Sequence, residues 1–154
     1  MVLICPFVDA TLSHPDISET DKRDLMLGPA GAREAGRLYA GELPIDHPLV
    51  SPVNADLRGF PTMQIFVATD GIASHDALIL AERAREAAVE VEVQVGIGLM
   101  HVWPILPIPE ARTSRAAMNE FLQAGRWTSM IHVRPCLQML LARRELHMIA
   151  RFPS

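Results

Sequence analysis

With 154 residues, of which 49% are hydrophobic and 21% are charged, the chain has the size and composition of one folded domain with its own core. The net charge is -4, and the first 125 residues hold 9 Lys or Arg against 17 Asp or Glu. This balance excludes the clustered basic surface that a nucleic-acid partner requires.

The cysteines and the first residues indicate a cytoplasmic protein. Cys5 and Cys136 lie far apart in no disulfide or metal-binding spacing, so two free thiols in a reducing compartment are expected. The segment Met1–Asp9 has no basic region and reaches an aspartate too early for a signal peptide. No apolar run approaches the length of a membrane span.

The first half of the chain predicts one strand and one helix. Val2–Val8 is a continuous apolar run of the kind that is buried in a parallel sheet. Asp16–Asp24 is polar. Ala32–Ala40 predicts a short helix that ends near Gly41 and is weakened internally by Gly36. A proline-punctuated, irregular crossing follows.

The second half predicts a β-α-β-α unit. Thr62–Ala68 is a strand, and Ser74 or Asp76 can cap the helix that follows it. Val89–Val95 alternates strictly, which is typical of a strand with one better-solvated side. Glu110–Gln123 carries apolar residues at helical spacing. The crossover in such a unit is right-handed and the strands are parallel.

Two residues at the ends of successive strands are the candidate site. Asp70 follows the strand at Thr62–Ala68, and His101 follows the next strand after a Gly96–Gly98 bend. Because the carboxyl ends of parallel strands share one rim, both residues are expected there. An acid and a histidine in this arrangement are two members of a hydrolase triad. The 154 residues contain no Gly-x-Ser-x-Gly nucleophile turn and no His-Gly-Gly-Gly oxyanion run.

Several segments, in matching order and spacing over about four fifths of the chain, resemble the C-terminal part of the α/β-hydrolase fold-3 family, the hormone-sensitive-lipase-like esterases. They are Cys5–Leu12, Gly28–Gly31, Leu38–Gly41, His47–Pro61, Ile65–Asp70, Leu80–Ala84 and Met100–Trp103. The resemblance implies the distal half of an α/β-hydrolase sheet, with parallel strands and crossover helices. It also implies that the first strands, the oxyanion glycines and the serine turn precede this segment.

The resemblance implies that His101 is the triad histidine, whereas the acid has two possible positions. Alignment on the strand end and Thr69 favours Asp70 as the acid. Alignment on Asp76 places Gly71 in that position instead, so that the acid is lost. The acid holds the imidazole tautomer, and a displacement of one residue costs orders of magnitude in rate.

The sequence also contains residues that suit other chemistry. Ser51 and Ser74 are the central candidates for a substitute nucleophile, but neither lies in a strand-to-helix turn, and neither is assigned that role. Asp70, His75, Asp76 and His101 include zinc-type ligands without a recognised spacing, so no metal and no cofactor are expected.

The domain organisation divides the chain at residue 125. Residues 1–125 form the partial hydrolase domain, and residues 126–154 form an unmatched basic extension with five arginines and one glutamate. Membrane binding by this extension is disfavoured because Pro135 interrupts it.

The family resemblance implies that the ancestral function is hydrolysis of small carboxylic esters. This chain is expected to lack the nucleophile and to be inactive when isolated. The alternative is a catalytically inactive truncated or interaction fragment of an esterase. Because the first strand, at Val2–Val8, would leave a sheet edge uncovered, self-association is expected.

Overall fold

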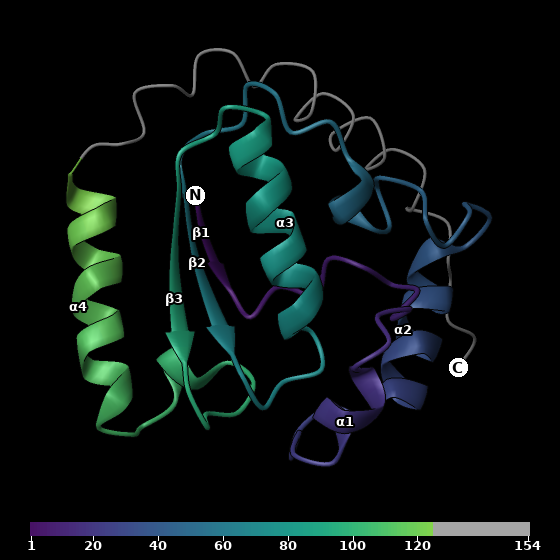
Figure 1. The fold of residues 1–154 in the computed structure, drawn as a ribbon, viewed down its shortest axis with the longest axis horizontal. Helices are drawn as coiled ribbons and strands as arrows, with labels where there is room; N and C mark the ends of the chain where they lie inside the picture. The colour runs from purple at the N-terminus through teal and green to yellow at the C-terminus, as the bar shows by residue number, and fades with distance from the viewer. Residues whose placement is uncertain (125–154) are drawn as a thin grey trace, which may run out of the picture.

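The fold was analysed in a computed structural model, which describes residues 1–124 (Figure 1). The predicted extension at residues 126–154 lies outside the described residues. Within the described part, no helix combines the length and apolarity required to cross a membrane.

A sheet of three parallel strands organises the molecule. Its strands β1 (Val2–Ile4), β2 (Met63–Ala68) and β3 (Val91–Gly96) lie in the order β1-β2-β3. In the register of the sheet, Ile65 of β2 pairs with Leu3 on one side and Val93 on the other. All three arrowheads point to the same edge, as Figure 1 shows. The predicted α/β class with parallel strands is therefore confirmed.

Helices cover both faces of the sheet. Helix α3 (Ser74–Glu86) connects β2 to β3 along the chain and runs antiparallel to the strands across one face of the sheet (Figure 1). Its buried stripe packs on Ile65 and Val67 of β2. Phe66, which points to the opposite face, contacts Trp103 of the 3-10 helix η2 (Trp103–Ile105), and helix α4 (Glu110–Gln123) packs there through Met118. The central strand is consequently buried throughout.

The N-terminal region contains two further helices and differs from expectation in its first strand. β1 ends at Ile4, because Cys5 adopts a positive φ of 43° and Pro6 has no N–H to continue the ladder. Helix α1 (Ile17–Asp21) lies within the polar segment Asp16–Asp24. It is a single short turn held by two buried side chains, Ile17 and Thr20, which is too short to produce a helical repeat in the sequence.

Helix α2 (Pro29–Ala40) begins three residues earlier than predicted, with proline at its first position. The interpretation of Gly36 as a weak point was incomplete. A Cβ at Gly36 would lie 2.9 Å from the Cβ of Ala10, so the glycine permits a close helix-to-loop contact. The crossing that follows α2 contains the 3-10 helix η1 (Pro52–Asn54).

The start of α3 also differs from expectation. Its N-cap is Ala73, and neither Ser74 nor Asp76 makes a side-chain capping hydrogen bond. Asp76 instead lies in the first turn, where a carboxylate interacts favourably with the positive end of the helix dipole.

Candidate active-site rim

The loops after β2 and β3 form one connected rim at the carboxyl end of the sheet. The Thr69 amide donates to the Gly96 carbonyl at 3.0 Å, and the Gly98 amide donates to the Thr69 hydroxyl at 2.8 Å. The Asp70 amide donates to the Leu99 carbonyl at 3.3 Å. These bonds place Asp70 beside the turn that leads to His101, so the expectation of a shared rim is confirmed.

The Asp70 carboxylate pairs with an arginine rather than with the histidine. Its Oδ1 accepts from Arg23 Nε at 3.1 Å and from the Thr69 hydroxyl at 3.4 Å. The Asp70 side chain is 26% exposed and that of Arg23 is 55% exposed. Within residues 1–124, no hydrogen bond joins Asp70 to His101. The acid–histidine contact of a working triad is thus not formed in this conformation.

His101 is a half-buried imidazole with an unused ring nitrogen. Its Nδ1 is buried and has no hydrogen-bond partner among the described residues. Burial lowers the pKa of His101, and the negative charge of Asp24 partly opposes that shift. The ring is therefore held in its neutral form near pH 7, the form in which a histidine accepts a proton.

Asp24 is the carboxylate that sequence reasoning missed. Its Oδ1 accepts from the amides of Met26 and Leu27, both at 2.9 Å, and its Oδ2 accepts from the Ile72 amide at 2.8 Å. The same Oδ2 lies 3.9 Å from the position that a Cβ at Gly71 would occupy. A carboxylate from the segment before α2 thus stands beside the alternative acid position. Its only sequence signal is an Asx-type turn, which is common in loops.

Strained backbone surrounds the same rim. Cys5, at the end of β1, has a φ of 43°, and Val102, directly after His101, has a φ of 52°. Burial raises the pKa of the Cys5 thiol, and backbone N–H groups of Val102 and Trp103 partly offset this. Cys5 is therefore a protonated, packed thiol at neutral pH, unlike the exposed low-pKa thiols that react.

Ser51 and Ser74, the two candidate substitute nucleophiles, are both buried. Ser51 accepts from the Ala10 amide at 2.9 Å and donates to the Ile45 carbonyl at 2.7 Å. Its hydroxyl therefore links the crossing that follows α2 to the loop after β1. Ser74 is the first residue of α3.

Asp76 is a buried carboxylate in the first turn of α3. It is 3% exposed, and its Oδ2 has no hydrogen-bond partner among the described residues. Burial and the charge of Asp9 raise the pKa of Asp76 to about 6, while His14 acts in the opposite direction. His75, one of the four zinc-type residues named from the sequence, lies near two other potential metal ligands, His14 and Asp16.

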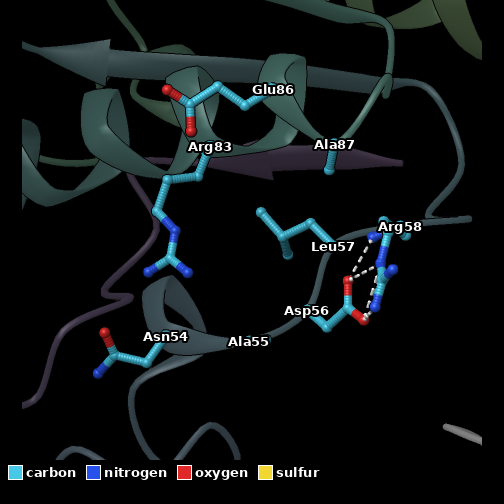
Figure 2. Close-up of a pocket in the computed structure, with 8 residues that line it drawn as sticks. All are labelled: Asn54, Ala55, Asp56, Leu57, Arg58, Arg83, Glu86 and Ala87. Carbon is cyan, nitrogen blue, oxygen red and sulfur yellow. Dashed lines mark hydrogen bonds and ion pairs between the residues drawn. The ribbon is translucent and has the colours of Figure 1, made fainter.

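A surface depression of about 500 Å³ lies away from this rim. Figure 2 shows its lining, which comes from η1, the segment after it and the last turns of α3. Asp56 and Arg58 pair across its edge at 2.6 Å. Because α3 runs opposite to the strands, its last turns lie at the amino end of the sheet, and this depression does not include Asp70 or His101.

Comparison with known proteins identifies the family. Residues 1–105 of the 154 match the family model described as an alpha/beta hydrolase fold. The chain belongs to the α/β-hydrolase fold family. The resemblance inferred from the sequence is therefore confirmed.

The relatives of this α/β-hydrolase chain include esterases of known name. It is 29% identical over 128 residues to an acetyl-hydrolase of Streptomyces hygroscopicus, covering 80% of this chain and 42% of that protein. It is 26% identical over 124 residues to an esterase of Acinetobacter venetianus, covering 79% and 41%. The chain thus spans about two fifths of the length of these curated relatives.

Solved structures show the same partial coverage. A hormone-sensitive lipase from a metagenome library aligns with a TM-score of 0.76 and 35% identity, covering 80% of this chain and 42% of that chain. The esterase EstE5, soaked by p-nitrophenyl butyrate, aligns with a TM-score of 0.76 and 25% identity, covering 82% and 43%. The α/β-hydrolase chain is therefore similar to less than half of each structure.

Proposed function

We propose that this α/β-hydrolase chain supplies the acid and histidine loops of a carboxylic-ester hydrolase, Asp70 and His101, and that the serine nucleophile is not among its residues. The observation that carries the proposal is the hydrogen-bonded rim on which the two loops meet. The chain order, acid before histidine, agrees with the order of an α/β-hydrolase triad. The names of the relatives, acetyl-hydrolase and esterase, support a small carboxylic ester as substrate.

In a complete site of this type, a serine oxygen attacks the ester carbonyl and backbone N–H donors stabilise the oxyanion. His101 accepts the serine proton and then returns it to the leaving alkoxide. Burial prepares its imidazole for this role by keeping the ring neutral. Under the proposal a carboxylate bonds to the buried Nδ1 and fixes the tautomer, and Asp70, here paired with Arg23, supplies that carboxylate. The chemistry requires no cofactor, and the proposed location is the cytoplasm.

A second candidate function is a catalytically inactive interaction fragment of an esterase. The ion pair between Arg23 and Asp70 and the unpartnered Nδ1 of His101 favour it, because this arrangement leaves the imidazole without its orienting acid. In that case the rim persists as structure after its chemistry has been lost.

The test is ester hydrolysis with the full chain, alone and supplemented. We expect the chain alone to hydrolyse p-nitrophenyl acetate and butyrate no faster than its His101→Ala variant, because most transition-state stabilisation is missing. A burst of product that disappears when one serine of this chain is replaced would overturn the proposal.

The supplement separates the two candidates. The N-terminal segment of the Streptomyces acetyl-hydrolase, up to the region aligned with this chain, is co-expressed with the chain. Under the proposal the complex hydrolyses the esters, and the His101→Ala variant abolishes that activity. A stable complex that remains inactive would support the interaction fragment instead.

A further inference from the structure

A group of metal-ligand side chains lies outside the candidate rim. His14 and Asp16, just before α1, meet His75 in the first turn of α3. One potential ligand atom from each residue lies within 4.8 Å of the others. The His14 and His75 rings stack at 4.2 Å between centroids, with 7° between their planes. Two segments far apart in the sequence thus present two imidazoles and one carboxylate together.

Hydrogen bonds define which nitrogen of His75 is available. The Thr20 hydroxyl donates to the Asp16 carbonyl at 3.1 Å, so its oxygen accepts from His75 Nε2 at 3.0 Å. The proton of the neutral His75 ring therefore resides on Nε2, and Nδ1 keeps its lone pair. Thr20 is 1% exposed and well fixed. A metal-bound histidine is typically oriented by a hydrogen bond of this kind from its other ring nitrogen.

The tautomer of His14 follows from a similar contact. Its Nδ1 accepts from the Asp16 amide at 3.2 Å, an exposed hydrogen bond. The neutral ring therefore also carries its proton on Nε2 and has its lone pair on Nδ1. The Asp16 Oδ2 lies 4.0 Å from this nitrogen, and the Asp16 side chain is 65% exposed. Asp16 thus has the freedom to turn its carboxylate toward an ion.

We propose that His14, Asp16 and His75 bind one zinc ion, or a first-row divalent ion of similar preference, between α1 and α3. Imidazole and carboxylate ligands suit zinc, and three protein ligands leave a fourth position for water. Mg²⁺ and Ca²⁺ prefer all-oxygen sites, so neither binds here.

Binding requires a local rearrangement. The lone pair of an imidazole nitrogen lies in the ring plane, so two parallel rings cannot both aim at one ion. The rings must tilt toward each other, and the bond from the Asp16 amide to His14 must break. These costs predict an affinity in the micromolar range, weaker than that of closed four-ligand zinc sites. The nearby Arg23 charge is already paired with Asp70.

The experiment is a titration of the full, tag-free chain carrying Cys136→Ser, which removes a competing thiol outside the described residues. Co²⁺ serves as the spectroscopic probe and Zn²⁺ displaces it. We expect one equivalent of Co²⁺ to produce visible absorption bands of a low-coordinate site. His14→Ala and His75→Ala should each weaken binding at least about tenfold, and Thr20→Val about tenfold through loss of the orienting contact.

His47→Ala is the matched control. The Nδ1 of His47 accepts from the Leu49 amide at 3.1 Å, the same local contact that His14 makes, but His47 is not part of the cluster. We expect this variant to bind Co²⁺ like the parent chain. Metal-free thermal unfolding of each variant shows whether a loss of binding reflects a loss of fold.

A second measurement needs no substitution of a ligand. With ¹⁵N-labelled histidine, added Zn²⁺ should shift the Nδ1 signals of His14 and His75 and leave those of His47 and His101 in place. No binding by the parent chain, equal binding by the His14→Ala and His47→Ala variants, or shifts confined to other histidines would each overturn the proposal.

Discussion

Arg23 Nε donates to Asp70 Oδ1 at 3.1 Å, and among residues 1–124 no hydrogen bond joins this carboxylate to His101. The carboxylate whose charge acts on His101 is Asp24, which is anchored by three backbone amides. Two aspartates thus lie at this rim, one paired with an arginine and the other with backbone amides.

A matched pair of substitutions separates these aspartates. Because the Asp24 charge opposes the effect of burial, Asp24→Asn should lower the pKa of His101 further. Asp70→Asn should leave the pKa of His101 nearly unchanged, since the Asp70 charge is neutralised by Arg23. Histidine NMR titration measures both. A large fall of the pKa in Asp70→Asn alone would show that Asp70 is the partner of His101 after all.

Stability should depend on pH through His101. Burial lowers its folded-state pKa below the unfolded value of about 6.5, so the unfolded chain binds more protons in the interval between the two values. The contribution of the neutral ring is then fully present above pH 6.5 and is lost as the pH falls through the folded-state pKa. We expect urea unfolding to show the parent chain losing more stability than His101→Gln between pH 7.5 and pH 5. Parallel pH profiles would contradict this prediction.

Gly96 allows β3 to end against the Trp103 ring. A Cβ there would lie 2.5 Å from two atoms of the indole, whose Nε1 donates to the Val67 carbonyl at 3.2 Å. Gly96→Ala should therefore destabilise the fold by about 1–3 kcal/mol through overpacking. Gly31→Ala, inside α2 with nothing within 4 Å, is the control and should be neutral or stabilising by up to about 1 kcal/mol. Chemical denaturation compares the two, and equal effects would refute the close-packing argument.

The uncovered sheet edge should cause association. Among residues 1–124, β1 pairs with β2 on one side, and its other ladder edge has no strand beside it. Exposed strand edges favour intermolecular pairing, so we expect oligomers or aggregates at tens of micromolar. Sedimentation velocity with and without the co-expressed N-terminal segment tests this. We expect the complex to self-associate less than the chain alone. A monomer that unfolds cooperatively would favour an independent small domain.

Periodic segments of the sequence predicted the fold well. Glu110–Gln123 was predicted as a helix and is observed with the same bounds as α4, because its apolar residues repeat over several turns. The strand Thr62–Ala68 differs from β2 by one residue. By contrast, α1 has five residues and could not show a repeat.

The candidate site was less accessible to sequence reasoning than the fold. The strand ends placed Asp70 and His101 on one rim, but no local pattern indicates that Arg23, 47 residues before Asp70, takes the carboxylate. The position of Asp24 beside Gly71 and the meeting of His14 with His75 likewise depend on how distant loops fold over the sheet. Such contacts are set by tertiary structure and leave no spacing in the sequence.

The bonds that join the two rim loops use the backbone and the Thr69 hydroxyl, and none uses the Asp70 carboxylate or the His101 ring. The bonds that hold the two loops together therefore do not depend on the side chains of Asp70 and His101. Substitutions of the Asp70 and His101 side chains leave the bonds that join the two loops in place.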